Sequence, residues 1–284
     1  MDAPRKSMIA SQMRGLVGAC KTGWHVLRRR GPSGIQFWFI ALVIGIAAGF
    51  AAVLFRTGIT FLQEAFYGTD NVRLIHSFAE TLPWYVILAI PILGGLAVGL
   101  ILSRFTSDGK VRSVAEVIEG AAMKDGRVEI KEGLASAAAS MITLGTGGST
   151  GREGPVVHLA AVISTWISNR LAADGITGRD LLGCAVAAAV SASCNAPIAG
   201  ALFALEVVLR HFAVHAFAPI VIASVAGTVI NRLAFGDITE FSLGEAGVLA
   251  FYVELPAFLL LGLLSGGVAV LMMRSIFWAD DFGR

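Results

Sequence analysis

Apolar residues fall in long stretches along this chain, separated by short segments rich in charge. Ile35–Phe55 contains 21 residues without a charged side chain, Leu82–Ser103 is a similar stretch, and Leu249–Met273 is apolar apart from Glu254. About 20 apolar residues suffice for a helix to cross the hydrocarbon core of a membrane. Pro91 lies inside the second stretch, where we expect it to kink the helix. The three stretches therefore predict membrane-spanning helices.

Between Ser103 and residue 231 the apolar segments are shorter, and glycine, proline or asparagine interrupts them. The predicted short helices are Val114–Met123, Lys131–Leu144, Val156–Ile167, Asp180–Ser193, Ile198–Leu209 and Phe217–Ile230, with a break at Asn195-Ala196-Pro197. In a bilayer, broken helices persist only where their free backbone groups are buried in protein or line a cavity. Helices broken near the midplane form ion sites in many transporters. The pattern favours a transporter-like membrane domain over a set of soluble core helices.

The composition supports a membrane protein. Apolar residues make up 56% of the 284 residues and charged residues only 15%, with a mean hydropathy of +0.75. Soluble domains carry about 25% charged residues, and disordered chains are polar, so both classes are excluded. The net charge of +2 argues against nucleic acid as a partner. Three scattered cysteines fit neither a disulfide framework nor a zinc site, so we expect no metal and no cofactor.

The positive charge is concentrated at the N-terminus. The first 30 residues hold seven lysines or arginines and one acid, Asp2. Cytoplasmic flanks of membrane helices collect such residues, so we expect residues 1–33 to be a basic cytosolic segment and 34–284 to be the membrane domain. A nucleic-acid-binding tail is the alternative. Residues 64–81 lean acidic and are predicted to be an outside loop. We expect an integral protein of a bacterial inner membrane.

The segment Gly145–Pro155 is the most informative one, because it holds five glycines in eleven residues. Pro155 favours a first-turn helical position, so a helix should begin near Gly154. Its free N–H groups and the positive end of its dipole favour anions. Glu153 lies at this helix start, and a carboxylate inside a membrane indicates a functional site. It could occupy the anion site when charged and leave when protonated or displaced, which describes a gate.

Other interpretations of this segment exist. A phosphate-binding P-loop does not fit, because a helix precedes the loop and Arg152 is followed by Glu153. Gly147–Gly151 matches the Gly-x-Ser-x-Gly pattern, so Ser149 could be the nucleophile of an intramembrane serine hydrolase. The candidate bases are His158, His211 and His215. In a purely structural interpretation the glycines form a hinge and Arg152 pairs with Glu116 or Glu119.

Two motifs resemble the CLC family of chloride channels and transporters. Gly151-Arg-Glu-Gly-Pro155 is similar to the signature of that family, and Asn195–Glu206 is similar to a second stretch about 40 residues later. The resemblance runs from about Phe37 to the end of the chain. It implies an all-α polytopic membrane fold with broken and tilted helices, built from two inverted halves.

The resemblance also implies a function, which is anion transport and not enzyme catalysis. Family members are homodimers in a lipid bilayer, each subunit with its own pore for chloride or another small anion. By the resemblance, Glu153 is the gating glutamate, and the residues Gly151, Arg152, Gly154 and Pro155 belong to an anion site. Ser113 is expected to add a hydroxyl to that site.

The chain departs from the family pattern at the first anion motif. Family members have Gly-Ser-Gly-Ile-Pro or similar, whereas this chain has Val111-Arg-Ser-Val-Ala115. Ser113 could supply the hydroxyl, but a shift of one residue would place Arg112 there. A fixed arginine would hold an anion too tightly for rapid passage, because conduction needs sites that release their ion.

Two further departures concern protons and length. Exchangers of the family carry a second glutamate after the position of Glu206, where this chain has Val207. Passive conduction is therefore favoured over proton-coupled exchange. A chloride/proton antiporter that uses another acid is an alternative, and His211 and His215 could titrate. The later family motifs are missing, so we expect the first inverted half plus the start of the second. A non-conducting truncated fragment is a further alternative.

Overall fold

The computed structural model describes residues 34–68, 80, 82–210, 212, 214–236 and 251–282, and every regular element in them is helical. The elements are α2 (Gly34–Tyr67), α4 (Trp84–Phe105), α5 (Val114–Met123), α6 (Ile130–Gly145), α7 (Glu153–Leu171), α8 (Gly175–Cys194), α9 (Pro197–Phe203), the π-helical turn η2 (Ala204–Leu209), α10 (Val214–Phe235) and α11 (Phe251–Phe282). The chain forms two compact units, residues 1–238 and 239–284. The predicted basic segment 1–33 lies outside the described residues and stays a prediction.

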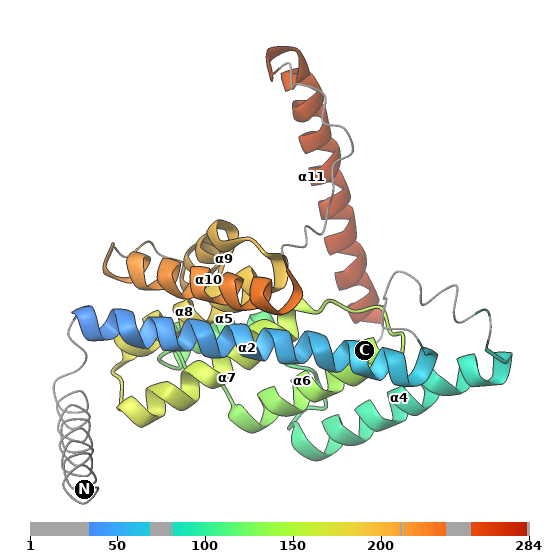
Figure 1. The fold of residues 1–284 in the computed structure, drawn as a ribbon. Coiled ribbons are helices and arrows are strands. Elements are labelled where there is room, and N and C mark those ends of the chain that lie inside the picture. Colours follow the sequence, from blue (N-terminus) through green and yellow to red (C-terminus); the bar gives the residue numbers. More distant parts are fainter. Residues whose placement is uncertain are drawn as a thin grey trace, which may run out of the picture. The chain divides into compact units, whose positions relative to one another are not determined.

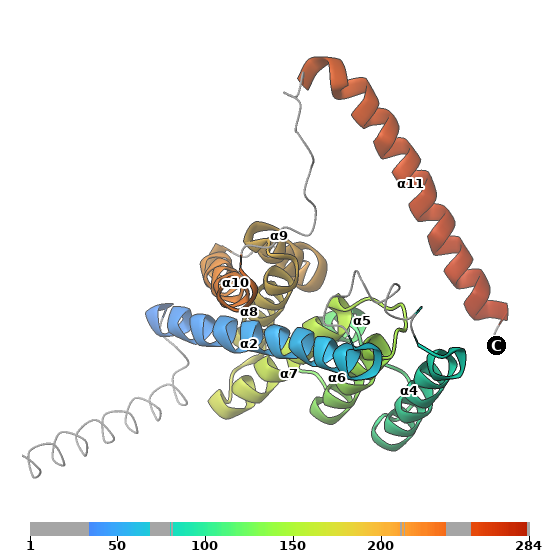
Figure 2. The same ribbon diagram turned by 45° about the vertical axis from the view of Figure 1, so that its right-hand side comes forward.

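The first unit is a helical bundle arranged around α2. This helix contacts α8 and α10 on one side and α6 and α7 on the other (Figure 1), and a second view shows the same order (Figure 2). Close approach depends on small residues, as it does in many membrane bundles. A Cβ added to Gly45 would lie 2.6 Å from the carbonyl oxygen of Ala223, and one added to Gly227 would collide with the backbone of Ala188. The helices therefore pack almost backbone against backbone.

Four described helices are long and apolar enough to cross a membrane. They are Gly34–Tyr67, Trp84–Phe105, Val214–Phe235 and the segment Glu254–Ala279 of α11. The three spans predicted from apolar stretches are confirmed as helices, and Pro91 lies inside α4. The fourth, α10, is longer than the predicted segment Phe217–Ile230. It continues through the polar residues Asn231 and Arg232, and Asn231 is buried in the bundle.

The first helix differs from its predicted bounds. It continues beyond Phe55 to Tyr67, so residues 64–67, predicted as part of a loop, are helical. The extension is held by burial, because Gln63 and Tyr67 are only 5% and 8% exposed despite their polar groups. Arg56 does not interrupt the helix, since its guanidinium lies 4.5 Å from the centre of the Phe235 ring. Tertiary contacts thus override the polar sequence.

The other short helices are present, but α7 and α8 extend well beyond their predicted bounds, and the predicted helix Ile198–Leu209 is divided into α9 and the turn η2. The helix α7 has 19 residues and α8 has 20, because both continue through polar residues at their ends. Asp174 caps α8 by accepting a hydrogen bond of 2.9 Å from the backbone N–H of Thr177. The predicted break after α8 is also confirmed. Asn195 ends that helix with a left-handed φ of 53°, and Pro197 begins α9.

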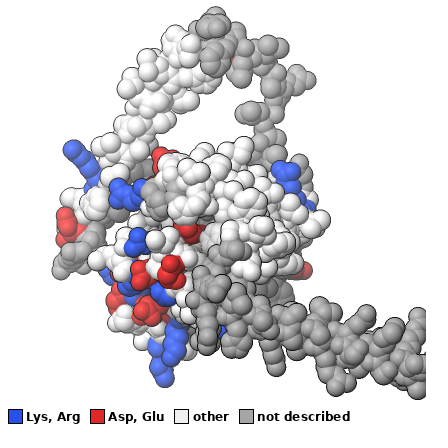
Figure 3. All heavy atoms as spheres, turned by 90° about the vertical axis from the view of Figure 1, so that its left-hand side faces the viewer, with Lys and Arg blue, Asp and Glu red and all other residues white. Residues whose placement is uncertain are grey.

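Charged side chains occupy a limited part of the described surface. In the face that Figure 3 shows, blue and red atoms are densest in one region, a few charged groups lie elsewhere, and much of the remaining described surface is uncharged. Exposed large apolar side chains are frequent on the helices that could span a membrane, including Phe50, Leu54, Leu93 and Leu100. Such exposure suits contact with lipid tails, where charged groups are costly.

Candidate functional site

The glycine-rich segment leads directly into α7, as the sequence predicts. The helix begins at Glu153, and Pro155 is its third residue. The backbone N–H of Val156 donates to the carbonyl of Arg152 at 3.4 Å, which makes Arg152 the N-cap. The side chain of Arg152 caps no backbone N–H of the helix. The amides of Glu153 and Gly154, in the first turn, have no intrahelical acceptor, which is the arrangement that attracts anions at helix starts.

Glu153 lies over the glycine loop that precedes it. A Cβ added to Gly151 would lie 3.5 Å from Oε2 of Glu153, so the carboxylate turns back toward the start of its own helix. Its side chain is 53% exposed, and Oε1 lies 3.7 Å from Nε of Arg152. A negative group near a helix N-terminus is stabilised by the helix dipole. The carboxylate therefore lies where an anion would be attracted.

The fold brings Ser113 next to this helix start. Ser113 is the N-cap of α5, and its Cβ lies 3.5 Å from where a Cβ on Gly154 would be. Two of the predicted anion-binding positions, 41 residues apart in the chain, are thus neighbours. The amide of this N-cap residue is already satisfied, because Ser113 N–H donates to Oε2 of Glu116 at 2.7 Å, and the Ser113 hydroxyl lies 3.3 Å from the same oxygen.

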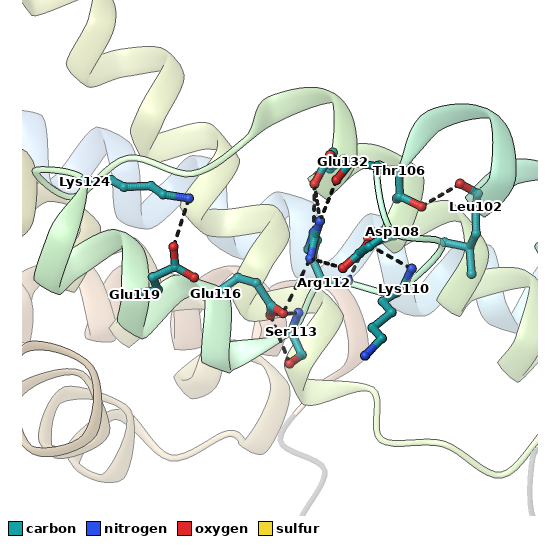
Figure 4. A network of polar contacts seen from close by, with 12 residues as sticks. Leu102, Thr106, Asp108, Lys110, Arg112, Ser113, Glu116, Glu119, Lys124 and Glu132 are labelled. Carbon is teal, nitrogen blue, oxygen red and sulfur yellow. Dashed lines mark hydrogen bonds and ion pairs between the residues drawn. The ribbon is translucent and has the colours of Figure 1, made fainter. Parts of the chain in front are cut away.

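Arg112 takes part in a network of acids (Figure 4). Its Nε and Nη2 lie 2.8 and 2.6 Å from Oε2 of Glu132 on α6. Its Nη1 lies 3.1 Å from Asp108 and 4.0 Å from Glu116. The arginine charge is therefore compensated by carboxylates of the protein. Because these acids already accept from the guanidinium, we expect Arg112 to hold an anion less tightly than an unpaired arginine would.

The same network changes the acidity of its carboxyl groups, which lie in the α4–α5 connection and at the beginning of α6. The hydrogen bond from Arg112 lowers the pKa of Glu132 below its ordinary value. The backbone N–H of Lys110 lowers the pKa of Asp108, and the charge of Arg112 acts in the same direction. Both carboxyl groups are therefore ionised at neutral pH, and the network keeps its ion pairs.

Residues of α2 hold the loop that leads to Glu153. The hydroxyl of Tyr67 donates to the carbonyl of Thr146 at 2.9 Å, and the amide of Gln63 donates to the carbonyl of Leu144 at 3.2 Å. Gly147 has a φ of 87°, and a Cβ there would lie 2.7 Å from the Tyr67 hydroxyl. The sequence reasoning missed this support because it ended the first helix at Phe55. The spacing of Gln63 and Tyr67, four residues apart, was the available signal.

The second family-like stretch also packs near the site. It forms the end of α8, then α9 and the turn η2, and η2 contacts α5. Val207 on this turn is 39% exposed. A valine side chain carries no ionisable group, so this position cannot relay a proton.

The histidines proposed as bases for Ser149 have other neighbours. His158 directs Nδ1 to the carbonyl of Ser113 at 3.3 Å, and Nε2 of His215 lies 3.2 Å from Asp180. His211 lies outside the described residues. Neither described histidine is hydrogen-bonded to Ser149, so a serine–histidine pair is not formed between them.

Two further observations concern the polar residues. Arg152 was considered as a partner of Glu116 or Glu119; its Nε lies 3.7 Å from Oε1 of Glu153, and Glu119 lies 3.1 Å from Lys124. Across the described ranges, no three histidine, cysteine, aspartate or glutamate side chains gather as a metal site would require.

Four apolar helices of membrane length, connected through broken and shorter ones, make the chain an integral, polytopic helical membrane protein. Residues 94–284 match the family model described as voltage gated chloride channel. The chain belongs to this family, the CLC chloride channels and transporters. The family recognised from two motifs and the all-α CLC-type fold are both confirmed.

Relatives and a solved structure agree with this assignment. The chain is 30% identical to a ClcB-like chloride channel protein of Ralstonia nicotianae over 241 aligned residues. These residues are 84% of the chain and 56% of the relative. The chain is 31% identical over 201 residues to the voltage-gated ClC-type chloride channel ClcB of Escherichia coli, covering 68% and 46%. Its fold matches the crystal structure of a CLC-type fluoride/proton antiporter with a TM-score of 0.61 and 26% identity, covering 82% and 55%. The chain thus spans about half the length of the proteins that it matches.

Proposed function

We propose that the protein carries chloride or another small anion across a membrane by passive conduction, with Glu153 as the gate. The proposal rests on the position of the Glu153 carboxylate, which lies over the glycine loop at the start of α7. The side chain of the N-cap residue, Arg152, does not cap the backbone amides there. The carboxylate and a passing anion would compete for the same amides. Anion transport is the activity of the family, which supports the assignment.

The residues around the gate have separate roles in this proposal. Gly151 leaves room for the carboxylate, Gly154 contributes a backbone amide, and Pro155 sets the first turn of α7. Arg152 lies 3.7 Å from the gate and adds positive potential. Ser113 borders the site from α5. Each role uses neutral amides or an exposed charge, which bind an anion without trapping it.

The setting of this site follows the family. We propose that the chain acts as a homodimer in a bacterial inner membrane, with a cytosolic N-terminus and with the anion as cargo in place of any cofactor. The name of the Escherichia coli relative supports a bacterial channel. An enzymatic role for Ser149 finds no support, because the described histidines have other neighbours.

Replacing the gate carboxylate tests the proposal. Glu153→Gln keeps the shape of the side chain and removes the charge that competes for the α7 amides. A charge at an exposed helix start contributes about 0.3–1 kcal/mol, so the apparent anion affinity should rise about twofold to fivefold. The measurement is chloride efflux from liposomes that contain the purified protein. Glu119→Gln is the matched control, because Glu119 is also half-exposed but pairs with Lys124. Equal efflux from all three proteins would remove Glu153 from the gate role.

Proton-coupled exchange is the second candidate. The solved structure of similar fold is described as a fluoride/proton antiporter. Against it stands Val207, which has no proton to exchange at the position where exchangers of the family carry an acid. Proton uptake into the same liposomes under a chloride gradient distinguishes the two candidates. Sustained uphill proton movement would contradict passive conduction, whereas chloride flux without it supports the proposal.

A further inference from the structure

His158 is the most completely buried ionisable side chain near the anion site. It lies in the second turn of α7 and is 1% exposed. Its Nδ1 lies 3.3 Å from the backbone carbonyl of Ser113, the N-cap of α5. A carbonyl oxygen only accepts, so Nδ1 carries the hydrogen, and Nε2 of the neutral ring carries none. The ring thereby connects the beginning of α5 to α7.

The opposite edge of the ring faces α6. A Cβ added to Gly133 would lie 2.9 Å from Nε2 and 2.7 Å from Cδ2 of His158. Nε2 is buried and has no hydrogen-bond partner within the described part of the chain. A buried polar atom without a partner is costly, so Nε2 does not contribute to the stability of the protein. The polar contact that His158 makes is the one from Nδ1 to Ser113. Position 133 must be glycine for the ring to keep this orientation.

We propose that His158 is a positioning residue that sets the distance between the beginnings of α5 and α7. The proposal rests on the anion site described above, which lies where Ser113 meets Gly154. The N-terminal end of α5 is attached to α6 by the hydrogen bond of 2.8 Å from the Arg112 backbone to Ser136, and to α7 by His158. Without the second bond, Ser113 can move away from Gly154, and the site widens.

Three variants separate this role from simple packing. His158→Asn places an amide N–H close to the position of Nδ1 and keeps the bond to Ser113, whereas His158→Leu removes it. Gly133→Ala keeps the histidine but displaces its ring, and alanine is a better helix former than glycine. Gly95→Ala is the matched control, because a Cβ on Gly95 meets nothing within 4 Å.

The test measures the chloride dependence of efflux from liposomes, separating the apparent KM from the maximal rate per folded protein. The KM should rise about threefold to tenfold in His158→Leu and Gly133→Ala, the worth of one net hydrogen bond. It should stay within about twofold in His158→Asn and Gly95→Ala. A merely structural role would lower the amount of folded protein and leave the KM unchanged.

The outcomes distinguish this inference from the proposed function. An unchanged KM in Gly133→Ala, or a His158→Asn protein as weak as His158→Leu, would overturn the positioning role while chloride transport by the unmodified protein stands. Absence of any chloride-dependent efflux from the unmodified protein would overturn both. If His158→Leu does not fold, the KM values of Gly133→Ala and His158→Asn test the positioning role by themselves.

Discussion

Removing Arg112 should destabilise the protein far more than removing another paired cation. Arg112 donates from Nε and Nη2 to one oxygen of Glu132, at 2.8 and 2.6 Å, and so ties the α4–α5 connection to α6. Arg112→Ala would leave the carboxylates of Glu132 and Asp108 facing each other without the guanidinium. Lys124→Ala is the matched control, because Lys124 forms a single ion pair of 3.1 Å with Glu119.

The magnitude follows from the exposure of the two pairs. The side chains of Arg112 and Glu132 are 17% and 18% exposed, whereas those of Lys124 and Glu119 are 50% and 49% exposed. Exposed pairs contribute about 0–1 kcal/mol, and removal of one partner from a fully buried pair costs about 3–5 kcal/mol. Hydrogen bonds to charged groups contribute about 1.5–3 kcal/mol. The loss for Arg112→Ala should therefore be about 2 kcal/mol, which is a factor of roughly 30 in the folding equilibrium.

The assay is reversible unfolding of the purified protein in mixed micelles, followed by tryptophan fluorescence. A double-mutant cycle of Arg112→Ala and Glu132→Gln isolates the pair, and its coupling energy should be about 1–2 kcal/mol. If Arg112→Ala and Lys124→Ala differ by less than about 0.5 kcal/mol, the partly buried network does not stabilise the junction. The same result would reopen the possibility that Arg112 is free to hold an anion.

Three further predictions follow from the described contacts. The pKa values of Glu132 and Asp108 are lowered in the folded protein. Both carboxylates therefore stabilise the fold above their ordinary pKa of about 4, and this stabilisation is lost as the pH falls through the lowered values. Unfolding measured between pH 7 and 3 gives the loss, which should be smaller in Glu132→Gln. Gly227→Ala places a methyl group against the backbone of α8 and should cost about 1–3 kcal/mol, measured as a lower melting temperature. Tyr67→Phe removes the donor to Thr146 and should cost about 0.5–1.5 kcal/mol, with faster hydrogen exchange in residues 146–151.

Local chemistry explains which parts of the fold the sequence predicts well. The bounds of Val114–Met123 are correct because Ser113 and Glu116 form an N-terminal capping pattern, and Gly120 accepts from the Lys124 amide where the helix ends. The beginning of α7 is predicted correctly because proline is favoured in the first turn of a helix, where a backbone N–H would have no acceptor within the helix. Asparagine and proline likewise mark the break after α8, because Asn195 ends that helix and Pro197 begins α9.

The errors arise where contacts between distant segments decide. The extension of α2 to Tyr67 depends on carbonyl groups 79 and 81 residues later, and the four-residue spacing of Gln63 and Tyr67 does not identify those partners. The ion pair between Arg112 and Glu132 was likewise not predicted, because Glu132 is 20 residues away and on another helix. The candidate site shows the same division. Glu153 and its helix start are apparent from a motif, whereas His158 and Gly133 become connected only when α5, α6 and α7 pack together.

The departure from the family pattern at residues 111–115 has a structural consequence for the anion. At α5, the Glu116 carboxylate accepts from the Ser113 amide, and Arg112 is engaged with acids. At α7, the side chain of Arg152 caps no amide of the helix. We propose that the attraction for an anion is stronger at α7, because its first amides have no acceptor within the helix and the Glu153 carboxylate lies beside them. A site of neutral amides with one competing carboxylate releases its ion readily, so the substituted motif shifts the balance toward α7 without creating a trap.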